Sequence, residues 1–134
     1  IPSREHYAMS NYAVLLVEDN DINRDMLTRR LTRAGLTVVT AADGVSALEM
    51  MREHQPGVVL MDMTLPILDG WEATQKAKED PAIAEIPIIA LTAHAMAADK
   101  ERAMSAGCSE YKTKPIDFPA LLAKIYQFLE GSDV

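Results

Sequence analysis

Apolar runs rich in β-branched residues constrain the fold of this chain more than any other feature. The longest lie at 13–17, 36–40, 58–61 and 86–91, and a shorter strand is predicted at 110–113. The four long runs lack the alternation of polar and apolar residues that marks a half-exposed antiparallel strand, so we expect both faces of each to be covered. Helical patterns separate the five runs. The sequence therefore predicts a doubly wound α/β domain with a five-stranded parallel sheet.

The first and last predicted helices carry the clearest apolar spacing. A helix over 21–34 ends at Gly35, and its inward residues are expected to be Ile22, Met26, Leu27 and Leu31. The last helix follows Asp117 as N-cap, and its apolar stripe consists of Phe118, Leu121, Leu122, Ile125 and Leu129. Stripes of this kind predict helices that pack against the sheet.

The middle helices are marked mainly by turn and capping residues. Asp43-Gly44 is predicted as a turn, and Asp69 with Glu72 resembles a capping box for a helix that ends at Asp80. A helix over 96–106 has only small or flexible apolar residues on its inward side. We therefore expect this helix to be weakly anchored and able to move.

Composition limits the class of protein. The length of 134 residues suits one domain, and the net charge of −7 with a pI near 4.9 argues against nucleic-acid binding. The single cysteine excludes an intrachain disulfide, and no apolar run is long enough to span a membrane. We expect a cytoplasmic domain over 11–131, preceded at 1–10 by a disordered or cloning-derived segment.

Polar residues lie directly after four of the five predicted strands. They are Glu18 and Asp19 after the first strand, Asp62 after the third, Thr92 after the fourth and Lys114 after the fifth. Ligands of open α/β sheets bind outside the carboxyl ends of the strands, so we expect these side chains to converge. Magnesium takes oxygen ligands, including one or two carboxylates. The sequence thus predicts a site for a divalent cation and a phosphoryl group.

Each of these residues also has a simpler interpretation. Glu18 and Asp19 could be an acidic first turn favoured by the helix dipole, Thr92 a β-forming residue and Lys114 a surface charge. Asp62 is harder to explain in this way, because an ionised carboxylate after four apolar residues is costly without compensation. The joint placement at four strand ends favours the site.

Four motifs in order and spacing resemble the receiver domain of two-component response regulators. They are Val17 to Asn20, Met61 to Pro66 with Asp69-Gly70, Ala90 to Ala93, and Tyr111 to Pro115. The resemblance covers about 13–129 and is closest to receivers of hybrid histidine kinases and to stand-alone, DivK-like regulators. It implies a flavodoxin-like fold with strand order 2-1-3-4-5 and magnesium as cofactor. From the length of 134 residues we expect no effector domain.

The resemblance also implies a role for each site residue. Asp62 would accept a phosphoryl group from a histidine kinase or a histidine phosphotransfer protein, with help from Lys114 and Thr92. Magnesium would be held by Asp19, Asp62 and the backbone carbonyl of Thr64, with Glu18 acting through water, and the backbone N–H groups near Met63 and Ala93 would bind the phosphoryl group. Thr92 and Tyr111 would form the switch, and Lys114-Pro115 would be a cis peptide bond. We further hypothesise that Thr64 and His94 set the lifetime of the acyl phosphate.

Two other functions remain open at this level. A phosphohydrolase of the haloacid-dehalogenase type also uses an aspartate at a strand end, but it requires a carboxylate two residues later, where this chain has Thr64. A receiver-like module could instead bind proteins without phosphorylation. On the receiver interpretation we expect a signalling protein rather than an enzyme, a monomer or weak dimer that acts on a downstream protein target.

Overall fold

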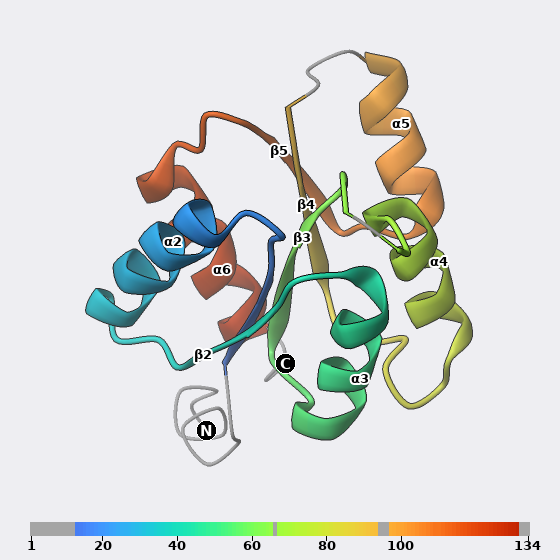
Figure 1. Cartoon of the computed structure of the whole chain (residues 1–134), viewed down its shortest axis with the longest axis horizontal. Helices are drawn as coiled ribbons and strands as arrows, with labels where there is room; N and C mark the ends of the chain where they lie inside the picture. Colours follow the sequence, from blue (N-terminus) through green and yellow to red (C-terminus); the bar gives the residue numbers. More distant parts are fainter. Residues whose placement is uncertain (1–12, 66, 94–96, 132–134) are drawn as a thin grey trace.

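The computed structural model describes residues 13–65, 67–93 and 97–131 (Figure 1). Its strands are β1 (Val14–Val17), β2 (Val38–Ala41), β3 (Val58–Asp62), β4 (Ile88–Thr92) and β5 (Glu110–Thr113). They form one parallel sheet in the order β2-β1-β3-β4-β5, which confirms the predicted topology. The predicted segment 1–10 lies outside the described residues.

Helices cover both faces of the sheet. They are α2 (Asp21–Arg33), α3 (Gly44–His54), α4 (Gly70–Glu79), α5 (Ala97–Ala106) and α6 (Phe118–Gly131). Helices α2 and α6 lie on one side, and α3, α4 and α5 lie on the other (Figure 1). Because side chains alternate along a strand, Leu16 joins the core beneath α2 and α6 while Leu15 joins the opposite core. The sheet is therefore held between two apolar layers.

The three inner strands are buried on both faces, as the apolar runs predict. Every residue of β1, β3 and β4 is buried, whereas β5 and all of β2 except Ala41 are half-buried. The prediction of full burial is wrong for the run at 36–40, because β2 is an edge strand with only one neighbour. The inner strands are also the ones that carry the candidate carboxylates and hydroxyl.

The inward face predicted for the first helix is half wrong. Leu31 is buried and Leu27 is half-buried, but Ile22 is 71% exposed and Met26 is 53% exposed. On a helix, positions 22 and 27 lie roughly 140° apart around the axis, so both pairs cannot face the sheet. The row formed by Leu27 and Leu31 turns inward, which leaves Ile22 and Met26 facing solvent.

Polar side chains cap the starts of α2, α3, α4 and α6. Asp69 accepts a 2.9 Å hydrogen bond from the N–H of Glu72, and Asp117 accepts one of 3.2 Å from the N–H of Ala120, both as predicted. Asp43 caps α3 rather than forming a free turn. Gly35 has a φ of +92° after α2, the left-handed conformation predicted for that position.

The start of α4 is fixed against the end of β3 by a close backbone approach. A Cβ at Gly70 would lie 2.5 Å from the carbonyl oxygen of Asp62 and 2.6 Å from the Cα of Met63. The N–H of Gly70 also donates a 3.3 Å hydrogen bond to the carbonyl of Met63. Only glycine fits here without moving α4 away from the end of β3.

None of the described helices is long and apolar enough to cross a membrane.

Gly70→Ala tests this close approach. Although alanine favours helices, the added methyl group must push α4 away from β3, so we expect the free energy of unfolding to fall by about 1–3 kcal/mol. The matched control is Gln75→Ala on the exposed side of α4, which should change stability by less than about 0.5 kcal/mol. Urea denaturation measures both variants. A Gly70→Ala protein as stable as the control would contradict the packing described.

Candidate functional site

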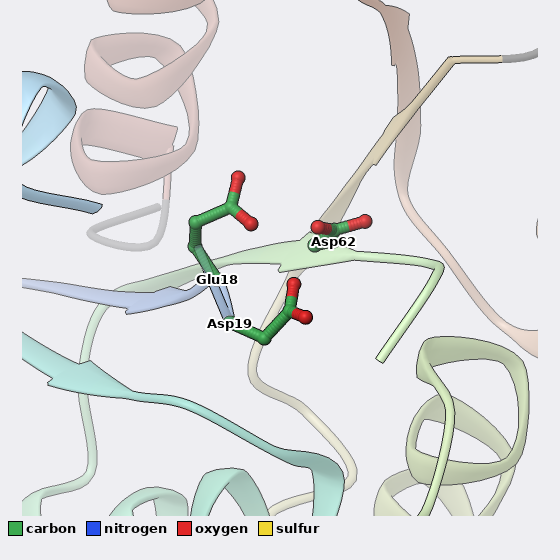
Figure 2. Close-up of side chains that lie close together, drawn as sticks. All are labelled: Glu18, Asp19 and Asp62. Carbon is green, nitrogen blue, oxygen red and sulfur yellow. The ribbon is translucent and has the colours of Figure 1, made fainter. Parts of the chain in front are cut away.

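Five polar side chains meet at the carboxyl edge of the sheet, as the sequence predicts. Glu18 and Asp19 follow β1, Asp62 ends β3, Thr92 ends β4 and Lys114 follows β5. Figure 2 shows the carboxylates of Glu18, Asp19 and Asp62 gathered at the ends of β1 and β3. Parallel pairing places Val17 of β1 beside Met61 of β3, which brings the acids that follow them together. The site is therefore a direct product of strand register.

The three carboxylates form a compact set of oxygen ligands. One oxygen from each of Glu18, Asp19 and Asp62 lies within 4.8 Å of the others. Asp19 is exposed, while Glu18 and Asp62 are only 6% and 5% exposed. Negative charges that lie this close together, two of them nearly removed from water, require compensation by positive charge or hydrogen-bond donors. A hard divalent cation fits the donor set, because its preferred ligands are oxygens of this kind.

Lys114 provides one source of compensation. Its Nζ lies 3.2 Å from Oε1 of Glu18 and 3.4 Å from Oδ2 of Asp62. The peptide bond to Pro115 is cis, which confirms the prediction. The backbone N–H of Lys114 also donates a 2.7 Å hydrogen bond to the carbonyl of Thr92. This bond ties the start of the lysine loop to the end of β4.

The pKa values of these groups reflect crowding of charge. Burial raises the pKa of Glu18 above its usual range, and the hydrogen bond and negative charge of Asp62 raise it further, while Lys114 and the N–H of Asn20 oppose them. For Lys114, burial alone would lower the pKa, but the carboxylates of Asp62 and Glu18 together raise it above its ordinary value. The lysine therefore stays charged, and the carboxylate cluster has a deficit of positive charge.

The two backbone N–H groups that follow Asp62 point in different directions. The N–H of Met63 donates to the carbonyl of Leu91 at 3.0 Å and so extends the ladder between β3 and β4. The N–H of Thr64 instead points to Oδ1 of Asp62 at 2.9 Å. Successive N–H groups of a strand point to opposite sides, which is why the N–H that faces the carboxylate belongs to the residue after Met63.

The remaining predicted residues lie around the cluster. Thr92 is 1% exposed, whereas its chain neighbour Ala93 is exposed, as is Thr64, two residues after Asp62. Tyr111 is half-buried and packs against the core beneath α3, α4 and α5. His94 lies outside the described residues. The structure therefore places the described site residues at or beside the carboxyl edge of the sheet, except Tyr111, which lies within β5 in register with Ala90.

Arg24 is a site residue that the sequence analysis missed. Its Nη1 donates a 2.9 Å hydrogen bond to the backbone carbonyl of Glu18, and it also pairs with Asp21. The Asn20 N–H donates to Oε2 of Glu18 at 3.3 Å. Together these bonds fix the backbone and carboxylate of Glu18. In the sequence, this role could have been inferred from the position of Arg24, one turn into the helix that follows Glu18 and Asp19.

Comparisons with known proteins agree with this geometry. The response regulator receiver domain family matches residues 14–126. The polar-differentiation response regulator DivK of Brucella anthropi is 38% identical over 117 residues, which cover 87% of this chain and 95% of that protein. Two solved receiver structures are similar to this chain in fold as well as in sequence.

The first example is the receiver domain of sensor histidine kinase PA1611 from Pseudomonas aeruginosa, which holds a magnesium ion in its active-site cleft. It is 33% identical with a TM-score of 0.82, covering 90% of this chain and 98% of that one. The second is the chemotaxis protein CheY4 of Vibrio cholerae, 28% identical with a TM-score of 0.80, covering 86% and 96%. The family match favours the receiver over the phosphohydrolase alternative.

The charge crowding around Glu18 is open to direct measurement. In metal-free protein, the carboxyl pKa of Glu18 should lie above its ordinary value of 4.5. Because this folded-state pKa is raised, the ionised group costs stability progressively as the pH rises above 4.5. Lys114→Met removes the nearby cation and should raise the pKa of Glu18 further. Carboxyl carbon NMR titration in the presence of a chelator measures both values.

The control for this titration is Lys76→Met, which removes an exposed cation on α4 that no contact joins to Glu18. It should leave the Glu18 pKa unchanged. A pKa at or below 4.5 in the unmodified chain, or the same pKa after Lys114→Met, would contradict the electrostatics described.

Proposed function

Because this chain belongs to the response regulator receiver domain family, we propose that Asp62 is the residue on which it accepts a phosphoryl group. The observation that carries this assignment is the position of Asp62. It ends the central strand β3, is 5% exposed, and lies against both the other two carboxylates and Lys114. Receiver domains are signalling modules, so the phosphoryl group is the signal itself. The chain assists only its own phosphorylation and dephosphorylation.

The donor set of this site fits magnesium. Asp19 and Asp62 would hold the ion directly together with the backbone carbonyl of Thr64, and Glu18 would act through water. Magnesium bound there supplies positive charge that offsets the carboxylates and the transferred phosphoryl oxygens. Support comes from the three oxygens within 4.8 Å and from the magnesium in the related PA1611 receiver.

The transfer step follows from the positions of the side chains. A carboxylate oxygen of Asp62 attacks the phosphorus of a phosphohistidine, the new O–P bond forms, and the P–N bond to the donor imidazole breaks with its electron pair going to nitrogen. Lys114, 3.4 Å from Asp62, neutralises charge on the equatorial oxygens. The hydroxyl of Thr92 and the N–H groups of Thr64 and Ala93 are the proposed hydrogen-bond donors. Positioning and charge neutralisation are all that this chemistry requires from the protein.

The new charge also provides the switch. Thr92 sits almost fully buried at the end of β4, and Tyr111 lies on the adjacent strand in register with Ala90. We propose that Thr92 moves toward the phosphoryl group and that Tyr111 follows it inward. The result is a shift in population between two states of the surface near α5. The partners are a phosphohistidine donor protein and a downstream protein that distinguishes the two states.

Phosphorylation of the intact chain tests this assignment. Incubation with acetyl phosphate and magnesium should add one phosphoryl group by intact mass, and Asp62→Asn should abolish the adduct. Omitting magnesium or replacing Asp19 by Asn should slow its formation at least tenfold, because the phosphoryl charge is then poorly offset. The matched control is Asp25→Asn, an exposed acid on α2 outside the cluster, which should react like the unmodified chain.

An adduct that persists in Asp62→Asn would contradict the assignment of the acceptor. An adduct that forms equally well without magnesium would contradict the role given to the carboxylate cluster.

A further inference from the structure

Helix α5 is held on the domain by few and small contacts. Of its described side chains, Ala103 and Ala106 are buried, whereas Met104 is 44% exposed. Small residues bury little apolar area, so this helix gains less from packing than α6 with its stripe of large residues. Figure 1 shows α5 beside α4 on the face of the sheet that also carries α3. The contacts between α5 and α4 therefore decide where α5 sits.

The C-terminal end of α5 is clamped. Lys78 of α4 donates from Nζ to the carbonyls of Ala84 and Ile86 at 3.0 and 2.8 Å, which fixes its side chain. That side chain packs so closely on Gly107 that a Cβ there would lie 2.5 Å from Cγ of Lys78. Gly107 also has a φ of +112°, a conformation suited to glycine. This end of the helix, which leads into β5, has little freedom.

A weaker contact holds the helix about one turn before this end. The guanidinium carbon of Arg102 lies 4.3 Å from the centre of the Trp71 ring. Arg102 is exposed, and among the described residues no carboxylate forms an ion pair with it. An exposed cation–π contact shifts an equilibrium by only about two- to fivefold, so thermal motion can open it. The stacking of Arg102 on Trp71 is thus weaker than the clamp at Gly107.

Trp71 connects this weak contact to the acceptor strand. It is 9% exposed and belongs to the same apolar cluster as Met63, the residue after Asp62. Its neighbour Gly70 packs directly on the backbone of Asp62 and Met63. A displacement of the backbone at the end of β3 would therefore be passed to the Trp71 ring through Gly70, the first residue of α4. The same ring meets Arg102.

We propose that the stacking of Arg102 on Trp71 is a latch that holds α5 in its unphosphorylated position, with the clamp of Lys78 on Gly107 as the pivot about which α5 turns when the latch opens. This inference rests on the proposed phosphorylation of Asp62 for its role in signalling. The latch favours the resting state, so a phosphoryl group must overcome it. Removing the latch makes the phosphorylated arrangement of α5 easier to reach.

Amide hydrogen exchange of the unphosphorylated protein tests the latch and the pivot without any phosphoryl donor. Arg102→Met keeps most of the side-chain length and removes the charge. We expect amides in the N-terminal half of α5 to exchange about two- to fivefold faster, while those around Gly107 keep their rates. Lys100→Met, an exposed residue of the same helix, is the matched control and should change neither. Arg102→Lys keeps a cation over the ring and should restore most of the protection.

Phosphorylation by acetyl phosphate with magnesium tests the coupling to Asp62. Trp71 is the single tryptophan of the chain, so its fluorescence reports on the latch directly. Phosphorylation should change this emission in the unmodified chain and in Lys100→Met. Arg102→Met should show part of the change before phosphorylation, and it should be phosphorylated about two- to fivefold faster.

The two experiments separate the possible failures. Unchanged exchange after Arg102→Met, or faster exchange that extends equally to Gly107, would overturn the latch. If exchange responds as expected but phosphorylation rate and Trp71 emission match the control, the coupling to Asp62 is wrong. If the unmodified chain takes up no phosphoryl group, the proposed function fails, and the exchange result still decides whether the latch exists.

Discussion

The crowding of three carboxylates at the end of a buried sheet is the constraint on which the rest of the structure depends. Glu18, Asp19 and Asp62 place their oxygens within 4.8 Å of one another, and two of the three are nearly inaccessible to water. Such a cluster is costly by itself, and Lys114 offsets only part of its charge. The remaining deficit is what gives the site its affinity for a cation and, through it, for a phosphoryl group.

Strand register, helix packing and hydrogen bonds hold this cluster in place. Fully buried inner strands fix the register that brings the acids together, and Gly70 allows α4 to pack on the backbone of Asp62 without a gap. Hydrogen bonds from Arg24 and Asn20 hold Glu18 in place. The parts that we propose to respond to a new charge, Thr92 and the lightly packed helix α5, lie at and after the end of the next strand, β4.

The sequence predicts local features of this molecule well and contacts between distant elements poorly. Strand order and the residues at strand ends follow from apolar runs and a family resemblance, so Asp62 and Lys114 could be placed in advance. The rotation of α2, which exposes Ile22, is set by packing that spacing alone does not define. The contact between Arg102 and Trp71 depends on how two helices meet, and no pattern along the chain contains that information.

Chemical trapping of the phosphorylated residue identifies the phosphoacceptor. Sodium borohydride reduces an acyl phosphate to an alcohol, so a phosphorylated aspartate becomes homoserine and can be located by peptide mass spectrometry. After reaction with a phosphodonor and magnesium, we expect homoserine at position 62 and unmodified aspartate at position 19. Homoserine at another acidic residue, or a phosphoryl group that resists reduction, would contradict the claim that Asp62 receives the signal.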